Sequence, residues 1–392
     1  MDSLENQRYD ANFIEISREI LRTNAKAVVD AVKVPVIGVL KFDGYFIGIT
    51  EAAKAWQAAG VTMFAVSESW EALQLREDGF TEDILLMAPV ADEKTLQELI
   101  AANIILTVSD LENAKFYQKF GAKRVHVKVD TGMGRFGVDY RDEEQIKALP
   151  KVKNIIFALG RKFGTGKEAC ETWQINVGVP ALITRHFGDA NYVVFSTGNV
   201  YPMRTPEEGG CDENTAPAPV GEYAMTSLGR ERIFEYAAKH YGAKVLLFRL
   251  NYAVDLRYGV LYDIAERIWN DQPVTLHVPA FNCVWQRYVN EAAIGALTMA
   301  SADVERLNVT GPEQYSTREA AEKLAAALGK PVTFLDDEGT CGLLSCADKC
   351  VKAFGMPDKT VDEMIVLQAE WMKSGGRQLD KPTHFQETKG NF

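Results

Sequence analysis

The chain has 392 residues, which is long enough for two domains or for one large α/β unit. Hydrophobic residues make up 47% of it and charged residues 25%, as in ordinary soluble globular proteins. The net charge of −11 at pH 7 argues against a nucleic-acid partner, because no basic stripe stands out in the sequence.

Membrane and metal partners are also not expected. No apolar run approaches the roughly 18 residues of a membrane span, and residues 1–10 are polar and acidic, unlike a signal peptide. We therefore expect a cytoplasmic protein. The six cysteines are too few and too scattered for a disulfide framework. Cys346 and Cys350 share a face if their segment is helical, but no histidine or second cysteine pair completes a metal site.

Apolar runs alternate with amphipathic segments over the first 140 residues. The runs are typical of buried parallel strands and lie at 34–41, 62–67, 83–89, 104–109 and 124–130. The helical patterns lie at 16–32, 50–60, 69–79, 92–102 and 110–121. Asp92 and Asp110 are candidate N-caps. This alternation predicts a parallel sheet with both faces covered.

After residue 140 the spacing becomes wider and irregular. Strands are expected at 154–160, 192–197, 244–250, 274–278 and 307–311, and helices at 222–242, 316–329 and 361–376. The connection 201–223 is long and rich in proline and glycine, and ordered loops of this length are usually functional. Periodicity alone would also allow one closed (β/α)₈ barrel, since eight of the predicted strands precede residue 251.

Lys41 ends the first apolar run, and the sequence F-D-G-Y that follows places Tyr45 four residues further on. Barrel enzymes display their catalytic side chains at this end of a strand. A lysine that is desolvated there can form a Schiff base with an aldehyde cofactor and then act as a base. Taken alone, a surface lysine that closes a strand is the commoner interpretation.

Residues from about 12 to 138 resemble the N-terminal part of the alanine racemase family of barrel enzymes. The matching stretches are GVLKFDGY (38–45), AAKAWQAAG (52–60), FAVSESWEALQLREDGF (64–80) and HVKVDTGMGRFG (126–137). The resemblance implies that Lys41 holds pyridoxal phosphate (PLP) and that Tyr45 lies against this cofactor. It also implies that Lys128 supports the site and that Arg135 holds the substrate carboxylate. Nothing after residue 138 resembles the family's second base or its phosphate cradle.

A second constellation lies further along the chain. The stretch VVFSTGNVYP (193–202) is an apolar strand that runs into hydroxyl residues, and the helix 222–242 carries Tyr223 near its start. A hydroxyl such as Thr197 at a strand end, facing a tyrosine, suits carbonyl–alcohol redox chemistry with the tyrosine as proton carrier. Taken singly, Thr197 capping a loop and Tyr223 packing in a core is the commoner interpretation.

Residues 139–392 resemble the NAD-dependent epimerase/dehydratase family, the extended short-chain dehydrogenase group. Further support comes from FRLNYAVDLRYG (248–259), WQRYVNEAAIGAL (285–297) and LNVTGPEQYSTREAAEKLAAALG (307–329). The resemblance implies that Thr197 and Tyr223 are catalytic and that NAD(P) is the cofactor. The implied cofactor contacts are Asp139 and Tyr140 at the adenine, Ala158 and Gly160 at a strand-end turn, and Asn251 at the nicotinamide end.

The sequence departs from this family at two places. Four residues after the tyrosine the family has a lysine, and this chain has Ser227, with Arg230 one turn further as a conceivable substitute. The family's first βαβ unit, with the glycine-rich loop that binds the diphosphate, is also absent. The segment FGTGK (163–167) contains glycines but lacks the spacing, so we expect a flexible substrate loop there, with phosphate contact as the alternative.

The predicted fold is α/β: a partial TIM-barrel-like segment (1–138) joined to a partial Rossmann-like parallel sheet with a small C-terminal α/β substrate region (139–392). The predicted function is a composite isomerase-type protein, of the nucleotide-sugar epimerase class in its second part. The alternatives are PLP-dependent racemisation through Lys41, and an inactive chimera or binding protein. The partner is a small-molecule substrate. An unclosed barrel would expose an apolar face, so coverage by the second part or a homo-oligomer is expected.

Overall fold

The structure is a computed structural model that describes residues 15–32, 35–130, 135–139, 142–149, 151–162, 168–376, 378–379, 381 and 383–390. The chain divides into two compact units, Met1–Leu149 and Pro150–Phe392. The described strands of the two units belong to separate sheets and do not form one eight-stranded barrel. The change of family at residue 138 stays a prediction.

The N-terminal unit alternates short strands with helices. Its elements are α1 (Arg18–Val32), β1 (Ile37–Val39), α2 (Lys41–Phe46), α3 (Ile49–Ala58), β2 (Met63–Val66), α4 (Ser69–Glu77), β3 (Asp83–Leu86), α5 (Glu93–Ala101), β4 (Leu106–Val108), α6 (Leu111–Lys119), β5 (Val125–Val127), β6 (Val129–Asp130), β7 (Val138–Asp139) and α7 (Glu143–Ala148). The five predicted strands contain β1 to β5. Asp92 and Asp110 cap α5 and α6, each accepting a hydrogen bond from the backbone N–H three residues on.

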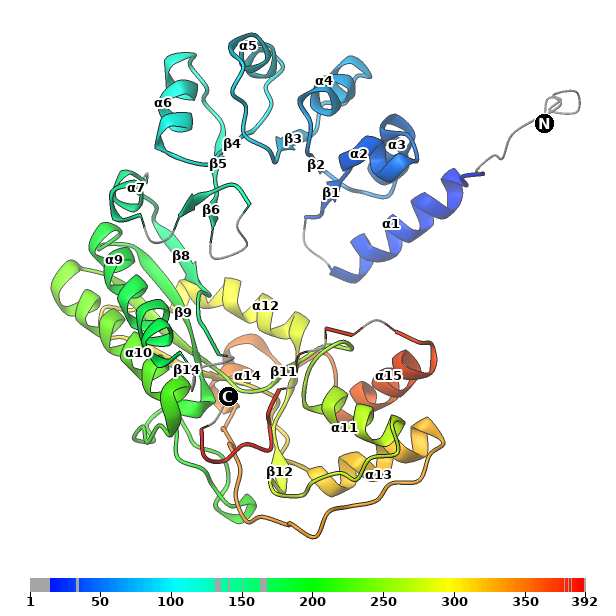
Figure 1. The fold of residues 1–392 in the computed structure, drawn as a ribbon, viewed down its shortest axis with the longest axis vertical. Helices are drawn as coiled ribbons and strands as arrows, with labels where there is room; N and C mark the ends of the chain where they lie inside the picture. Colours follow the sequence, from blue (N-terminus) through cyan, green and yellow to red (C-terminus); the bar gives the residue numbers. More distant parts are fainter. Residues whose placement is uncertain are drawn as a thin grey trace, which may run out of the picture. The chain divides into compact units, whose positions relative to one another are not determined.

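Strands β1 to β5 are neighbours in chain order, and all their pairings are parallel. β1 pairs with β2, β2 with β3 and β4 with β5, while a bridge from Leu85 to Ile105 joins β3 to the residues leading into β4. Helices α3 to α6 cover one face of these strands (Figure 1), and Phe64, Leu86 and Leu106 are buried there. An unbroken chain order is that of a barrel wall, whereas a doubly wound sheet reverses its order. The predicted barrel-type segment is confirmed.

The C-terminal unit contains longer strands and helices. Its elements are β8 (Asn154–Phe157), α8 (Ala169–Trp173), η1 (Gln174–Gly178), α9 (Val179–His186), β9 (Asn191–Thr197), η2 (Gly198–Val200), η3 (Pro206–Glu208), α10 (Gly221–Tyr241), β10 (Lys244–Leu250), β11 (Ala253–Val254), α11 (Val260–Trp269), β12 (Ala280–Phe281), β13 (Val284–Trp285), α12 (Gln286–Gly295), η4 (Ala296–Met299), β14 (Glu305–Val309), β15 (Tyr315–Ser316), α13 (Thr317–Leu328), α14 (Asp348–Phe354) and α15 (Val361–Lys373). Strands β8, β9, β10 and β14 form one parallel sheet in that order.

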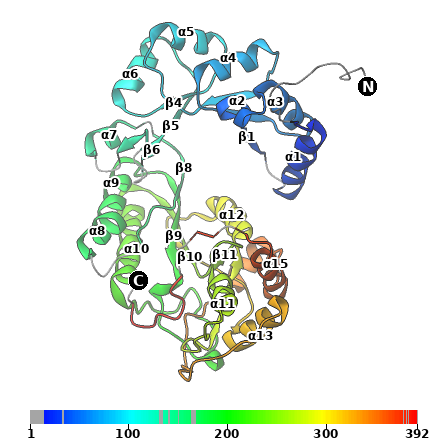
Figure 2. The same cartoon turned by 45° about the vertical axis from the view of Figure 1, so that its right-hand side comes forward.

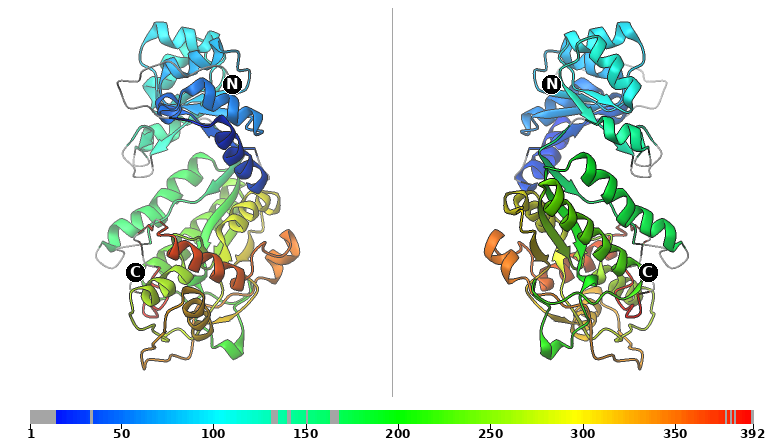
Figure 3. Two further views of the ribbon diagram at one scale, coloured as in Figure 1. Left: turned by 90° about the vertical axis from the view of Figure 1, so that its right-hand side faces the viewer. Right: turned by 90° about the vertical axis from the view of Figure 1, so that its left-hand side faces the viewer.

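Helices cover both faces of this sheet, as in a Rossmann-like layer. Figure 2 shows α9 and α10 on one side of β9 and β10 and α12 on the other, and Figure 3 gives two further views of these layers. Tyr192 packs on Phe234 of α10, and Phe248 belongs to the core that includes Val289 of α12. The predicted partial Rossmann-like sheet is confirmed.

A second core lies among α11, α13 and α15, where Ile264, Leu324 and Ile365 are buried together. This is the small C-terminal region expected from the sequence. The strand predicted at 274–278 is wrong: Val274 makes an isolated bridge with Phe334, and the run is buried without joining a sheet. A short apolar run does not by itself distinguish a paired strand from a buried irregular segment.

Candidate functional site

The backbone after β1 forms a left-handed turn beside the predicted site residue Lys41. Phe42, Asp43, Gly44 and Tyr45 have φ angles of 55°, 50°, 61° and 57°. Residues other than glycine avoid this region, and each costs roughly 1–3 kcal/mol, so the surrounding contacts must hold the turn. Backbone strain of this kind clusters at functional sites, which makes the turn a candidate functional element.

Two carboxylates hold this turn. Oδ1 of Asp43 accepts a hydrogen bond from the N–H of Ile49 at 2.8 Å, and the N–H of Asp43 donates to Oε1 of Glu71 at 3.0 Å. Glu71 is fully buried and also accepts from the backbone N–H groups of Ser67 and Glu68. The turn is therefore tied through one buried carboxylate to the loop between β2 and α4, and this connection offsets its strain.

The turn brings two predicted residues together, since Nζ of Lys41 lies 6.0 Å from the centre of the Tyr45 ring. Lys128 lies between β5 and β6, with its Nζ 5.8 Å from the ring of Phe136. Arg135 lies in the turn before β7. A shared action of Lys128 and Arg135 with Lys41 on one substrate stays a prediction.

The described residues of the N-terminal unit offer side chains suited to only one end of PLP. Lys41 and Tyr45 offer an amine and an aromatic ring, but the cofactor also needs groups that hold its phosphate and its ring nitrogen. In a closed barrel, phosphate sites usually follow the later strands. In the described part of this unit, β5 is followed by the short pair β6–β7 and by α7, with no further barrel strand. The described residues of this unit therefore include no later barrel strand that could carry a phosphate site.

Asp139 and Tyr140, the two residues predicted to contact the adenine of a dinucleotide, belong to the N-terminal unit. Asp139 ends β7 and pairs in register with Asp130, while Tyr140 lies outside the described residues. Residues 132–137 read G-M-G-R-F-G, the glycine spacing of a dinucleotide loop, but Gly137 leads into β7 and not into a helix. A Cβ on Gly137 would lie 2.7 Å from the nitrogen of Asp130, so this glycine allows β6 and β7 to approach. Adenine contacts by Asp139 and Tyr140 stay predictions.

A pocket of about 250 Å³ lies at the carboxyl ends of β9 and β10 in the C-terminal unit. Three predicted residues line it together: Thr197 at the end of β9, Tyr223 in the first turn of α10, and Asn251 directly after β10. The carboxyl ends of parallel strands meet at one edge of a sheet, and ligands of open α/β sheets bind there. The two strand ends and the helix start thus form one site.

Hydrogen bonds fix the strand ends of this pocket. Oγ1 of Thr197 accepts from the N–H of Asn199 at 3.2 Å and donates to its side-chain oxygen at 2.8 Å. The amide of Asn251 donates to the carbonyl of Leu343 at 2.9 Å. A Cβ on Gly198 would lie 3.1 Å from Asn251, so a larger residue would press on it. Thr197 therefore both caps its loop, as the simpler interpretation holds, and lines the pocket.

Neither candidate for the missing lysine lines the pocket. Ser227 is buried, and its hydroxyl has no hydrogen-bond partner among the described residues. Arg230 is also buried and donates to the carbonyl of Phe195 at 2.7 Å and to the side-chain oxygen of Asn176 at 2.8 Å. A Cβ on Gly160 would lie 2.6 Å from this guanidinium, so Gly160 packs against Arg230. Arg230 acts as a fixed charge behind the pocket wall.

The remaining predicted positions follow β8. Ala158 is exposed one residue after the strand. Its predicted contact with a cofactor, like that of Gly160, stays a prediction. The segment 163–167, predicted as a flexible substrate loop, lies outside the described residues.

Ten of the thirteen lining residues were not predicted from the sequence, and Lys162 and Thr383 are among them. Nζ of Lys162 donates to the carbonyl of Thr383 at 3.1 Å, and the N–H and hydroxyl of Thr383 donate to the carboxylate of Asp263 on α11. Burial lowers the pKa of Lys162 to about 8, with the charge of Asp263 opposing, and burial raises the pKa of Asp263 to about 6. Figure 1 shows the red C-terminal segment beside β11, where Tyr252 donates to the carbonyl of Phe385.

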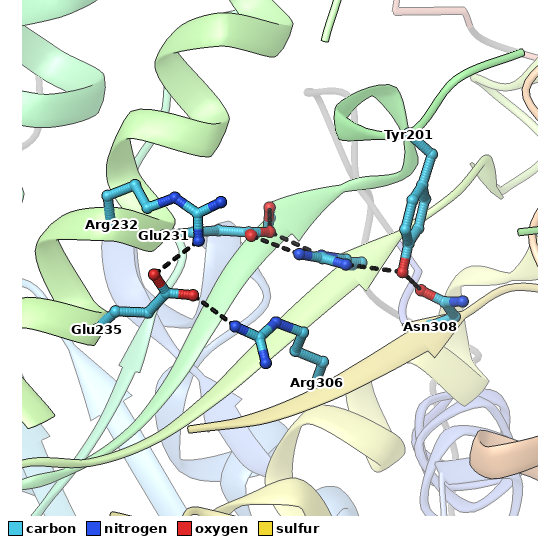
Figure 4. A network of polar contacts seen from close by, with 8 residues as sticks. Tyr201, Glu231, Arg232, Glu235, Arg306 and Asn308 are labelled. Atoms are coloured by element: carbon cyan, nitrogen blue, oxygen red, sulfur yellow. Dashed lines mark hydrogen bonds and ion pairs between the residues drawn. The ribbon is translucent and has the colours of Figure 1, made fainter. Parts of the chain in front are cut away.

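A buried polar network lies under the pocket (Figure 4). Arg249 and Glu231 have 1% and 0% exposed side chains and are joined by two hydrogen bonds of 2.9 and 2.7 Å. Ser196, which lines the pocket, donates to Glu231 at 2.6 Å, and Tyr201 bridges Arg249 to Asn308. The network joins β9, β10, β14 and α10, and it fixes the helix that carries the pocket tyrosine.

Cys350 is buried with its sulfur 3.5 Å from the hydroxyl of Tyr288. In the described part of the chain, no group of three or more His, Cys, Asp or Glu side chains is arranged to hold a metal ion. The described helices also include none long and apolar enough to cross a membrane.

These features define a chain of two unlike α/β units: a barrel-type unit with a strained lysine turn, and a Rossmann-type unit with a threonine–tyrosine pocket. By sequence, residues 16–159 match the alanine racemase N-terminal domain. The alanine racemase of Methanococcus maripaludis is 35% identical over 150 residues, covering 36% of this chain and 40% of that protein. That of Carboxydothermus hydrogenoformans is 35% identical over 159 residues, covering 39% of each. The chain thus spans about two-fifths of the length of these curated relatives.

Solved structures of sugar-nucleotide epimerases are similar in fold to this chain. UDP-glucuronic acid 4-epimerase from Bacillus cereus, in complex with UDP-glucuronic acid and NAD, is similar with a TM-score of 0.53 and 16% identity, over 71% of this chain and 95% of that one. UDP-glucose 4-epimerase from Thermotoga maritima, with UDP-glucose, is similar with a TM-score of 0.52 and 14% identity, over 86% and 99%. At these identities the likeness shows the fold alone. The predicted resemblance to alanine racemase is confirmed by sequence. The predicted resemblance to NAD-dependent epimerases is confirmed in fold.

Proposed function

We propose that this chain is a composite of two isomerase-type units, and that its C-terminal unit binds a hydroxylated ligand of the nucleotide-sugar class. The observation that carries the proposal is the pocket that Thr197, Tyr223 and Asn251 line together. Hydroxyl and amide groups at one edge of a parallel sheet match the hydroxyls of a sugar. The similar epimerases are in complex with UDP-glucuronic acid and UDP-glucose, which supports this ligand class.

The chemistry for which the pocket is suited is the interconversion of a carbinol and a carbonyl group. That reaction moves a proton at oxygen and a hydride at carbon. The phenol of Tyr223 is the group that exchanges the proton, and Thr197 orients the ligand oxygen by hydrogen bonding. The hydride would need an acceptor such as NAD, which the B. cereus epimerase structure contains.

The described residues fit only part of an NAD site. A dinucleotide needs a glycine-rich loop at a helix N-terminus for its diphosphate. β8 is the edge strand of the C-terminal sheet, and in the described residues of this unit no strand lies beyond it to carry such a loop. We expect ligand binding at the Tyr223 pocket and much weaker dinucleotide binding than in an intact epimerase.

The proposal is tested by thermal denaturation with UDP-glucose, with UDP and glucose as separate controls. A ligand at about 100 times its Kd adds roughly 2.7 kcal/mol to the free energy of unfolding, so the wild-type midpoint should rise measurably. Tyr223→Phe and Thr197→Val should weaken the effect, because each removes one hydroxyl from the pocket. Tyr236→Phe is the matched control, since Tyr236 lies on the same helix and is 51% exposed. An equal rise in Tyr223→Phe, or no rise in the wild type, would overturn the proposal.

A second function, capture of PLP by Lys41, is favoured by the strained turn. An imine of PLP absorbs near the visible edge, and we expect this band to form with the wild-type chain and to vanish in Lys41→Ala. Lys54→Ala, on the exposed side of α3, should retain it. We expect no racemisation, because the unit lacks a phosphate cradle in its described residues. A band of undiminished size in Lys41→Ala would exclude this site.

A further inference from the structure

We propose that the Tyr223 pocket selects its ligand by the direction of its hydrogen bonds. Thr197 and Thr383 line the pocket as hydrogen-bond acceptors, so the pocket binds a ligand hydroxyl that donates and discriminates against a carbonyl, an ether or a fluoride at the same place. This inference rests on the proposed function, because it specifies which groups of the ligand the same pocket recognises. It adds a donor requirement that the fold likeness does not imply.

Each of these threonines uses its only hydroxyl hydrogen inside the protein. Oγ1 of Thr197 donates to the side-chain oxygen of Asn199 at 2.8 Å, and Oγ1 of Thr383 donates to the carboxylate of Asp263. Each of the two oxygens also accepts one backbone N–H at 3.2 Å, from Asn199 and from Phe385 respectively. Since a hydroxyl has one hydrogen and two lone pairs, each side chain has a single lone pair left for a ligand.

The partners of these hydroxyls fix the direction of both hydrogen bonds. Oδ2 of Asp263 receives the N–H of Thr383 as well as its hydroxyl, and an ionised carboxylate can only accept. At Thr197 the backbone N–H of Asn199 points at Oγ1, so the hydroxyl hydrogen is directed to the amide oxygen instead. Neither threonine can turn its hydrogen to a ligand without giving up a hydrogen bond inside the protein.

Two further hydroxyls of the pocket wall have the same orientation. Ser196 donates to Glu231 at 2.6 Å, and two hydrogen bonds from Arg249 keep this carboxylate an acceptor. Tyr252 donates to the carbonyl of Phe385 at 3.4 Å. The acceptor character therefore belongs to several lining residues from β9, from the end of β10 and from the C-terminal segment, and not to one side chain.

A sugar hydroxyl suits this wall better than a group that only accepts. Donor groups also line the pocket, on the amides of Asn199 and Gln286. A hydroxyl can donate to a threonine lone pair and accept from an amide at the same time. A carbonyl oxygen or a fluorine would face the threonine lone pair with no hydrogen between them, where Thr197 and Thr383 are only 5% and 2% exposed and water compensates little. The pocket therefore favours the carbinol form of a ligand over its carbonyl form.

The test is isothermal titration of the full chain with UDP-glucose and with analogues that lack one hydroxyl at a time. Fluorine or hydrogen replaces the hydroxyl at each sugar position in turn, at pH 7.5, where Asp263 is ionised because its pKa is raised only to about 6. Fluorine keeps an acceptor atom of similar size but has no hydrogen. In the wild type we expect at least one fluoro analogue to bind about tenfold more weakly than UDP-glucose, and no more tightly than its deoxy counterpart by more than a small factor.

Variants assign the discrimination to the threonines. Thr197→Val and Thr383→Val keep the shape of the side chain and remove the acceptor, so each should lower the ratio of UDP-glucose affinity to fluoro-analogue affinity toward one. Thr298→Val is the matched control, because the Thr298 hydroxyl also donates to a protein acceptor, the carbonyl of Gly295, but at an exposed position outside the pocket. Denaturation midpoints verify that each variant is folded.

The outcomes separate this inference from the proposed function. If every fluoro analogue binds as tightly as UDP-glucose, or if both valine variants keep the full ratio, the inference is wrong while the proposed function stands. Weak binding of a deoxy analogue whose fluoro counterpart binds fully would show that the ligand hydroxyl accepts and does not donate, which also overturns it. If UDP-glucose does not bind the folded wild type at all, the proposed function fails and this inference fails with it.

Discussion

At the scale of single residues, the strongest constraint in the C-terminal unit is the buried pair of Arg249 and Glu231. Both side chains are almost completely buried, and two hydrogen bonds join them. The carboxylate of Glu231 also accepts a hydrogen bond from the hydroxyl of Ser196. Burial disfavours the charge of Arg249, but the bonds to Glu231 outweigh it and raise the arginine pKa. Removing one partner would leave a buried charge without compensation, which is costlier than removing both.

We therefore predict that Arg249→Met lowers the free energy of unfolding by about 3–5 kcal/mol, measured by denaturant titration. The double variant Arg249→Met/Glu231→Leu should recover much of this loss, because no unpaired charge remains. The matched control is Arg232→Met, which breaks an exposed ion pair with Glu235 on the same helix and should cost far less. A loss in Arg249→Met no larger than in Arg232→Met would contradict the role given to the pair.

Individual site residues differed in how far the sequence could predict them. Thr197 and Tyr223 were predicted from a strand end and a helix start, and Asn251 from the resemblance to the epimerase family; the carboxyl edge of the parallel sheet brings the three together. Lys162 and Thr383 come from irregular segments, where no periodicity indicates position. Only the place of Lys162 shortly after a strand offered a signal, and nothing local pointed to Thr383.

At the scale of elements, the regular part of the fold could be predicted and the strained part could not. Apolar runs and caps located β1 to β5 and β8 to β10, because burial and hydrogen bonding of those segments are local properties. The left-handed turn of Phe42 to Tyr45 opposes the preference of its own residues and exists because Glu71 and Asp43 hold it. Such conflicts between local preference and structure concentrate at functional sites.

The helices of the second unit could also be predicted only in part from the sequence. α10, α13 and α15 were predicted from their patterns, whereas α8, α9, α11, α12 and α14 were missed. α9 follows a π-helical stretch and has a proline near its start, both of which interrupt a simple periodic reading. α11 begins after Gly259, at a φ of 133°, in a stretch for which no element was predicted.

At the scale of the whole molecule, the chain contains two separate frameworks. Each compact unit has its own strands and its own core among the described residues. The amine of Lys41 belongs to the first unit, and the Tyr223 pocket belongs to the second. The described residues that line the pocket all belong to the second unit, so we predict that ligand binding there needs no side chain from the first unit.

Hydrogen-exchange mass spectrometry of the full chain with and without UDP-glucose tests this assignment most directly. We predict slower exchange at 191–200, 221–230, 250–260 and 383–390, the segments around the pocket, with no change over 35–130. The same experiment on Tyr223→Phe should show the effect reduced at every one of these segments. Slower exchange over 35–130, or its absence around the pocket at saturating ligand, would contradict the account.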